Sequence, residues 1–168
     1  MPATYEGDIV LSNLTDPSLA DAHLANPDLL WPLGMVEYKF YRTFPPKHQT
    51  MVREAMDYIT ERTPCVTFVL ADSESINYVT IISSGTKCAS ELGMRGGRQM
   101  LWLNSGCFEN GLMIPVHELL HTLGLRGVID GVKRAVCDDI NLIHCFPSDT
   151  NSSTFDNFCC MQCSSFTS

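Results

Sequence analysis

The sequence contains two histidines and a glutamate whose spacing would let them bind a metal ion and catalyse hydrolysis. His117 and His121 are four residues apart, and Glu118 directly follows the first of them. On an α-helix, residues at i and i+4 project from one face, so both imidazoles can bind one metal ion beside the carboxylate. Imidazole ligands leave zinc a coordination position for water, and a neighbouring carboxylate can take that water's proton. The pattern predicts Glu118 as the general base and His117 and His121 as ligands of one Zn²⁺ per chain.

The residues after the second histidine narrow the class of zinc site. Gly124 completes the pattern His-Glu-x-x-His-x-x-Gly, in which the glycine lets the chain turn back and deliver a third ligand. A class that takes its third ligand from a downstream glutamate does not fit unless the chain is incomplete, because no glutamate follows Glu118 in this sequence. An aspartate ligand stays open at Asp130, Asp138 or Asp139. The alternative to a metal site is a chance cluster whose two histidines are satisfied in the core of an amphipathic helix.

The elements that would position these residues can be predicted from the pattern. One helix is expected from Lys47 to Thr63 after Phe44-Pro45-Pro46, because a proline suits a first turn. A second is expected from about Gly111 to Leu123, with Gly124 as its stop. Apolar runs bounded by turn formers predict strands at Val36–Phe40, Cys65–Leu70, Tyr78–Ile82 and Gln99–Leu103. Strands around two helices favour an α+β layer architecture.

The length, the apolar runs and the net charge of the chain limit the kinds of partner it could bind. The chain has 168 residues, enough for one domain, and no apolar run approaches the eighteen or so residues that span a bilayer. Its formal net charge is −8, and residues 1–38 contain no Lys or Arg. A chain with this charge is a poor match for a phosphate backbone, so we expect neither a nucleic-acid partner nor a membrane span.

Eight cysteines indicate an oxidising, extracellular setting. The spacings do not form the paired Cys-x-x-Cys sets of structural zinc modules, and two Asn-x-Ser/Thr sequons, at Asn13 and Asn151, agree with secretion. The first residues form neither a basic nor an apolar region of a signal peptide. Either a signal peptide lies upstream or the chain is not secreted.

Several short motifs in order resemble landmarks of the astacin family of metzincin zinc endopeptidases. The zinc helix is the most specific of them. The others are Leu30-Trp31-Pro32-Leu33-Gly34, Phe44-Pro45-Pro46-Lys47-His48, Cys65-Val66-Thr67-Phe68-Val69, Gly97-Arg98-Gln99 and Ser105-Gly106-Cys107. The resemblance implies a zincin-like α+β fold. Its mixed sheet would be mostly N-terminal, its second long helix would carry the HExxH pattern, and its C-terminal subdomain would be short.

The resemblance also assigns roles outside the helix. Cys88 and Cys107 match a pair that forms a local disulfide, whereas Cys65 matches a cysteine whose usual partner would lie beyond Ser168. One strand resembles the edge strand along which family members lay a substrate backbone. Its residues are Gln99, Met100, Leu101, Trp102 and Leu103.

The N-terminal residues resemble a pro-segment. Tyr5-Glu6-Gly7-Asp8 is similar to the family motif whose aspartate occupies the open zinc position and keeps the zymogen latent, so Asp8 is a candidate inhibitory ligand. The alternative is a solvated carboxylate in an acidic stretch. The expected organisation is a pro-segment remnant at 1–21, an astacin-like N-terminal subdomain at 22–126, and a divergent, truncated C-terminal subdomain at 127–168.

Three departures from the family pattern bear on activity. The position of the third zinc histidine is Gly127, and the following glutamate, which anchors the newly cut N-terminus, is Val128. Cys163 or His144 could in principle replace the missing ligand, although Cys163 could equally be disulfide-bonded or exposed. Without Lys or Arg before Lys39, a trypsin-like enzyme has no site near Asp21 or Ala22, where the mature chain would begin.

These features leave three hypotheses. The first is a secreted zinc metalloendopeptidase that acts on protein or peptide substrates. The second is a catalytically inactive astacin-like domain that binds peptides or partners through its retained strand, because Gly127 cannot coordinate a metal. The third is an incomplete product without a stable fold.

Overall fold

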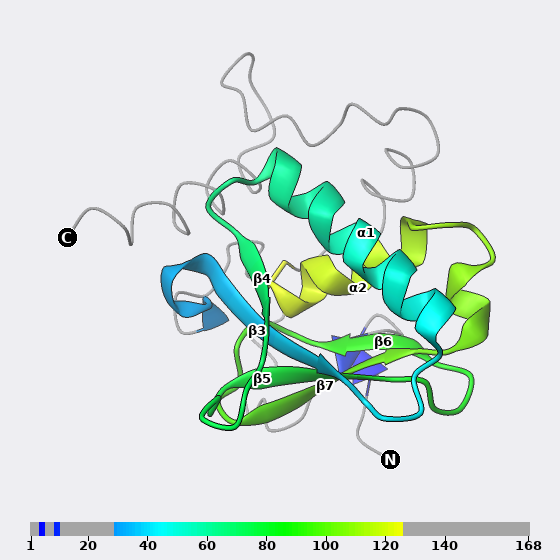
Figure 1. Cartoon of the computed structure of the whole chain (residues 1–168), viewed down its shortest axis with the longest axis horizontal. Helices are drawn as coiled ribbons and strands as arrows, with labels where there is room; N and C mark the ends of the chain where they lie inside the picture. The colour runs from blue at the N-terminus through cyan, green and yellow to red at the C-terminus, as the bar shows by residue number, and fades with distance from the viewer. Residues whose placement is uncertain (1–3, 6–8, 11–28, 126–168) are drawn as a thin grey trace.

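Two helices cover one face of a mixed sheet (Figure 1). The computed structural model describes residues 4–5, 9–10 and 29–125. Helix α1 spans Pro46–Arg62, with Pro45 at its N-cap, and helix α2 spans Met113–Thr122. The side chains that α1 buries recur every three or four residues: Val52, Ala55, Met56 and Ile59. Helix α1 is therefore amphipathic, with one stripe facing the core.

Within the described residues the sheet has seven strands in the order β1-β2-β6-β7-β5-β3-β4. Strands β2–β6, β7–β5, β5–β3 and β3–β4 pair in parallel, whereas β1–β2 and β6–β7 are antiparallel. The bounds are Thr4–Tyr5 (β1), Ile9–Val10 (β2), Met35–Phe40 (β3), Thr67–Leu70 (β4), Tyr78–Ile82 (β5), Cys88–Glu91 (β6) and Arg98–Leu103 (β7). Short 3₁₀ turns lie at Pro32–Gly34 (η3) and Ser105–Phe108 (η4).

The predicted α+β architecture is confirmed, and each predicted strand and helix is present within about two residues of its expected bounds. Strand β6 was missed. Its sequence, Cys-Ala-Ser-Glu, has none of the β-branched or aromatic residues that mark a strand. Tertiary pairing with β7 and packing against α2 give this segment its conformation.

The expectation that Gln99–Leu103 forms an edge strand is wrong. These residues belong to β7, which pairs with β5 on one side and with β6 on the other. The strand that lies outward of β7 is β6, and its outer side pairs with Ile9 and Val10 of β2. Sequence patterning located the strand correctly but could not give its order in the sheet, because pairing depends on contacts distant in sequence.

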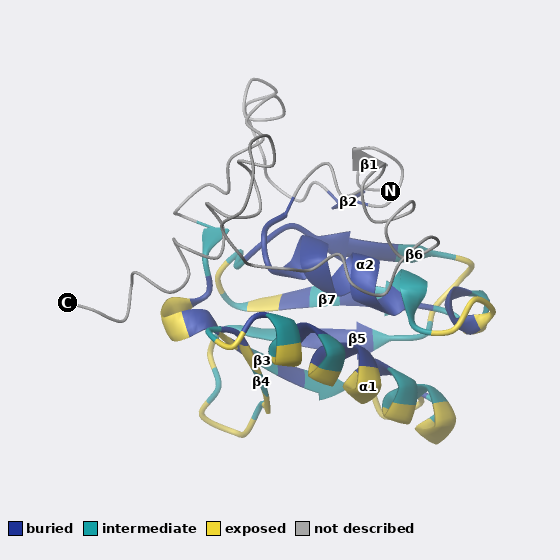
Figure 2. Ribbon diagram, turned by 90° about the horizontal axis from the view of Figure 1, so that it is seen from above, coloured by how far each residue is buried: buried dark blue, intermediate teal, exposed yellow. Residues whose placement is uncertain are grey.

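The core lies between the helices and the sheet. Figure 2 shows that most of α2 is buried, whereas α1 exposes one side. Residues Pro115 to Thr122 of α2 are all buried, and Val52 and Ile59 of α1 pack into the same cluster. Because α2 is surrounded on every side, its histidines and glutamate are positioned by packing as well as by helix geometry.

Gly34 is the point where the chain from η3 passes closest to the segment before β4. It has a φ of +64°, and an added Cβ would collide with the carbonyl oxygen of Cys65. Gly85 has the same φ of +64° but has nothing within 4 Å of such a Cβ. The two glycines thus share a left-handed backbone, but only Gly34, which is buried, has another segment within reach of an added Cβ.

We expect Gly34→Ala to lower the free energy of unfolding by at least ~3 kcal/mol, because backbone strain and a backbone clash combine. Gly85→Ala should lose only about 1–2 kcal/mol, the strain alone. Urea unfolding of both variants measures the difference. Equal losses would show that the Gly34 approach is not tight.

Candidate active site

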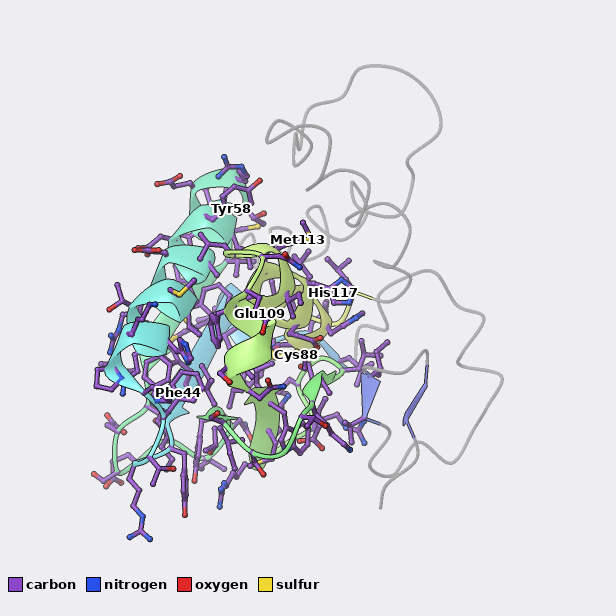
Figure 3. The ribbon with its side chains drawn as sticks, turned by 90° about the vertical axis from the view of Figure 1, so that its right-hand side faces the viewer. Phe44, Tyr58, Cys88, Glu109, Met113 and His117 are labelled. Atoms are coloured by element: carbon purple, nitrogen blue, oxygen red, sulfur yellow. A yellow bond between two sulfur atoms is a disulfide. The ribbon has the colours of Figure 1, made fainter. Side chains whose placement is uncertain are left out.

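The two histidines of α2 converge. His117 Nε2 lies 3.0 Å from His121 Nε2, and the ring planes meet edge to face with centroids 4.5 Å apart. His117 is 6% exposed and His121 is fully buried. In Figure 3, His117 projects from the side of α2 that faces away from α1. The i, i+4 spacing therefore brings both rings to a common point.

The end of α2 fixes the orientation of His121. Gly124, with a φ of +100°, lets the chain reverse. The N–H of Gly124 donates to His121 O at 2.9 Å and the N–H of Leu125 donates to Leu120 O at 3.1 Å. This pair of bonds is a Schellman motif, with glycine in the left-handed position. It aims the carbonyl oxygen of Leu125 at the His121 ring.

His121 Nδ1 lies 2.7 Å from that Leu125 oxygen. A carbonyl oxygen can only accept a hydrogen bond, so Nδ1 carries the hydrogen and the neutral ring keeps its lone pair on Nε2. In metal sites, a histidine commonly binds the metal through one ring nitrogen and donates the N–H of the other to a backbone carbonyl. His121 is thus held in the tautomer that zinc requires.

The separation of His117 Nε2 and His121 Nε2 is compatible with two ligands of one zinc ion. In a tetrahedral site with Zn–N bonds of about 2.0–2.1 Å, two ligand nitrogens stand roughly 3.3 Å apart. The observed separation of 3.0 Å is close to that value. Within residues 4–5, 9–10 and 29–125, the structure contains no group of three metal-ligating side chains. A third protein ligand would have to come from elsewhere in the chain.

Glu118 lies beside His117 on the buried helix and is 1% exposed. The other predicted site residues, Asp8, Gly127 and Val128, lie outside the described residues, as do the suggested substitutes Cys163 and His144. The structure therefore brings together His117, Glu118 and His121 on α2.

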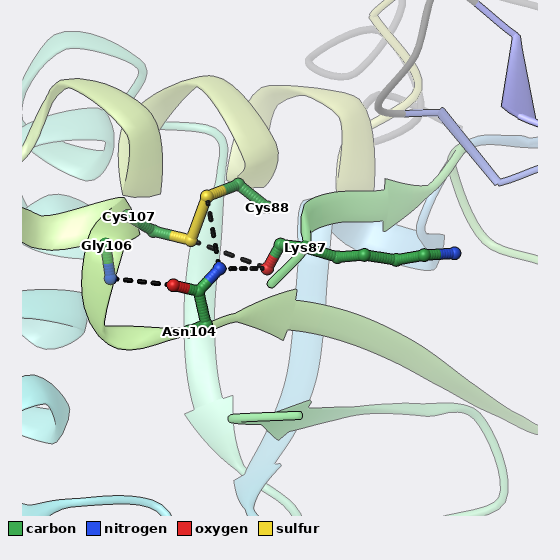
Figure 4. The surroundings of a disulfide bond; sticks show 5 residues. All are labelled: Lys87, Cys88, Asn104, Gly106 and Cys107. Atoms are coloured by element: carbon green, nitrogen blue, oxygen red, sulfur yellow. Dashed lines mark hydrogen bonds between the residues drawn. A yellow bond between two sulfur atoms is a disulfide. The ribbon is translucent and has the colours of Figure 1, made fainter. Parts of the chain in front are cut away.

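A disulfide between Cys88 and Cys107 links β6 to η4, as the resemblance implied (Figure 4). The Asn104 side chain adds to this link, because its Nδ2 donates to Lys87 O at 2.9 Å and its Oδ1 accepts from Gly106 N at 2.7 Å. Cys65 is also disulfide-bonded.

Side chains that sequence reasoning did not single out hold the C-terminal turn of α2. Trp31 Nε1 donates to Thr122 O at 2.8 Å, and the Gly93 N–H donates to His121 O at 2.9 Å. The last carbonyls of a helix lack i+4 donors within the helix, so Trp31 supplies a donor to Thr122 O, and Gly93 adds a second donor to His121 O beside Gly124 N–H. The tryptophan lies 91 residues from its partner, a separation no local pattern reveals.

Comparison with known proteins decides the family. The family model named Astacin, which describes a family of peptidases, matches residues 23–145. This chain belongs to the astacin family. The family's members include zinc metalloproteases, and that family-level activity agrees with the converging histidines of α2.

Named astacin-family relatives are similar along much of the chain. Zinc metalloproteinase nas-6 of Caenorhabditis elegans is 32% identical over 126 residues, which are 71% of this chain and 35% of that protein. Zinc metalloproteinase nas-17 of the same organism is 37% identical over 95 residues, 56% of this chain and 21% of that protein. Bone morphogenetic protein 1 of Xenopus laevis is 31% identical over 104 residues, 61% of this chain and 14% of that protein. The chain thus aligns with about a third or less of the length of these relatives.

A solved structure shares the fold. High choriolytic enzyme 1, a hatching enzyme zinc-protease from Oryzias latipes, superposes with a TM-score of 0.53 at 28% identity, covering 59% of this chain and 50% of that one. The astacin-type architecture of the described core is therefore supported by both sequence and structure.

Trp31→Phe removes the indole N–H from a fully buried carbonyl and keeps most of the ring. We expect a loss of about 1–3 kcal/mol in unfolding free energy, because Thr122 O is left without that donor. Trp102→Phe is the control, since Trp102 is only half-buried and its indole makes no hydrogen bond to the residues that the structure describes. Thermal unfolding that ranks Trp102→Phe as the more damaging change would contradict this role for Trp31.

Proposed function

We propose that this chain is an astacin-type zinc metalloendopeptidase domain that hydrolyses peptide bonds. The proposal rests on the 3.0 Å separation of His117 Nε2 and His121 Nε2, together with the hydrogen bond between His121 Nδ1 and Leu125 O. Family membership supports the same chemistry at a coarser level. Its substrate class would be protein or peptide.

Each residue of α2 has a distinct role in this proposal. His117 and His121 would hold one Zn²⁺, which when bound supplies Lewis acidity to a water and to the scissile carbonyl. Glu118 would accept the proton of the attacking water on its carboxylate and then pass it to the leaving amine. Burial of Glu118 excludes bulk water from the carboxylate, which strengthens its interaction with nearby charge.

The peptide would lie along the outer edge of β6 in place of the β7 edge expected from sequence. Strand β6 is the strand of the described core whose outer side pairs with an N-terminal segment, Ile9–Val10, in parallel. Both of these residues are buried, at 0% and 2% exposure. A bound peptide could use the same backbone groups by β-augmentation.

This placement supports a latent form. Asp8 directly precedes Ile9, which pairs opposite Ser90 of β6. The resemblance of Tyr5-Glu6-Gly7-Asp8 to an inhibitory pro-segment motif then assigns Asp8 to the open zinc position. Residues 1–21 would be the pro-segment remnant, 22–126 the N-terminal subdomain, and 127–168 the divergent C-terminal subdomain of a secreted protein. Among the described residues no helix is both long and apolar enough to cross a bilayer.

A second candidate is an inactive domain that binds peptides or partners. Gly127 at the expected third ligand position favours it, as does the lack of Lys or Arg in residues 1–38. Loss of the cleavage site together with Val128 is consistent with abandoned activation. N-terminal sequencing of secreted protein would then find no cut near Ala22, and a cut there would argue for the active form.

Zinc content of the purified full chain separates the two candidates. The peptidase proposal expects close to one zinc per chain, and a zinc affinity at least ~10–100-fold weaker in His121→Ala, because a direct ligand is lost. His48→Ala is a matched control: His48 stacks on Phe108, with ring centroids 4.2 Å apart, and lies on α1. A folded, disulfide-bonded wild-type protein without zinc would favour the inactive domain.

Glu118→Gln tests the general base without removing a ligand. The variant should keep its zinc and lose peptidase activity by at least ~100-fold, because an amide cannot accept the water's proton. Glu109→Gln, at an exposed carboxylate, should keep both properties. Peptidase activity of Glu118→Gln equal to that of Glu109→Gln would rule out the assigned role.

A further inference from the structure

A pair of buried hydroxyls joins β6 to the last turn of α2. Ser90 Oγ lies 2.8 Å from Thr122 Oγ1, and the two residues are 0% and 1% exposed. Thr122 Oγ1 also donates to Glu118 O at 3.1 Å, and Ser90 Oγ donates to Glu91 O at 2.8 Å. Each hydroxyl has a single hydrogen and a backbone carbonyl within reach, so either one can be the donor between the two hydroxyls.

Thr122 occupies a central place at this helix end. It directly follows His121 and precedes the glycine turn that presents Leu125 O to His121 Nδ1. Its carbonyl oxygen accepts from Trp31 Nε1, so the carbonyl and the hydroxyl of Thr122 are each bonded to a neighbouring segment. The hydrogen bond from Gly93 N, in the segment after β6, to His121 O falls on the same turn.

His117 does not depend on these bonds to the same degree. It lies one turn earlier, where buried residues on both sides and regular helix geometry hold it. A change at Thr122 would therefore move His121 relative to His117. The 3.0 Å approach of their Nε2 atoms is sensitive to that movement, since each ring has a single direction in which it can offer a lone pair.

We infer that Ser90 and Thr122 are positioning residues, which hold His121 in register with His117 for metal binding. The inference rests on the proposed zinc site. Neither hydroxyl is assigned as a ligand, and both would act through the backbone of the last turn of α2. Ser90 also pairs with Ile9, so one residue of β6 contacts both the segment on its outer edge and the zinc helix.

Isosteric substitution can remove the Thr122 hydroxyl without leaving a cavity. Thr122→Val keeps the shape and deletes the hydrogen bonds, whereas Thr122→Ser keeps the hydroxyl. Thr80→Val is the matched control, because Thr80 is also 1% exposed and its hydroxyl accepts from Arg98 Nε at 3.1 Å on a strand away from α2. Both valine variants lose a buried hydroxyl, so both should lower the melting temperature.

Zinc dissociation constants of the full chain, measured by competition with a chromogenic chelator, test the inference. We expect Thr122→Val to bind zinc about 10–100-fold more weakly, with Thr122→Ser and Thr80→Val within about threefold of wild type. The cobalt(II) absorption spectrum should change in Thr122→Val and not in Thr80→Val.

The outcomes are distinguishable. A wild-type chain that binds no zinc overturns the proposed function and this inference together. A wild-type chain that binds zinc, with Thr122→Val indistinguishable from Thr80→Val in affinity and spectrum, overturns the inference alone. Failure of Thr122→Ser to restore wild-type affinity would likewise assign the effect to packing of the methyl group and contradict a role for the hydroxyl.

Discussion

The hydrogen bond from His121 Nδ1 to Leu125 O is the interaction on which the candidate site depends. It sets the tautomer of the ring, directs the Nε2 lone pair toward His117, and requires that the chain reverse immediately after α2. Gly124 allows the reversal, because its φ of +100° is one that side chains rarely adopt. The glycine of the His-Glu-x-x-His-x-x-Gly pattern therefore orients a ligand as well as ending a helix.

The helix end is in turn fixed from outside. Hydrogen bonds join Trp31, Ser90 and Gly93 to the last turn of α2. The Cys88–Cys107 disulfide ties the same β6 strand to the η4 turn that precedes α2. Strand β6 is thus linked to the end of α2 through Ser90 and to η4, the turn before α2, through the disulfide. The outer side of β6 pairs with Ile9 and Val10.

Sequence reasoning succeeded where the determinants are local. Helix periodicity, the proline before α1 and the glycine after α2 located the helices, and the four-residue spacing of the histidines predicted their shared face. It failed where long-range pairing decides: β7 was placed at an edge although β5 and β6 flank it, and β6 was missed because Cys-Ala-Ser-Glu has no strand-like pattern. The bonds of Trp31 and Ser90 to Thr122 span 91 and 32 residues and have no signature in the sequence.

The central claim is that His117 Nε2 and His121 Nε2 form a preorganised pair of zinc ligands. A crystal structure of the zinc-loaded full chain, with anomalous diffraction recorded at the zinc edge, tests it most directly. The account predicts one anomalous peak between the two rings, within about 2.0–2.1 Å of both Nε2 atoms, with Leu125 O still accepting from His121 Nδ1. A peak elsewhere, or one that contacts only one of the two histidines, would contradict it.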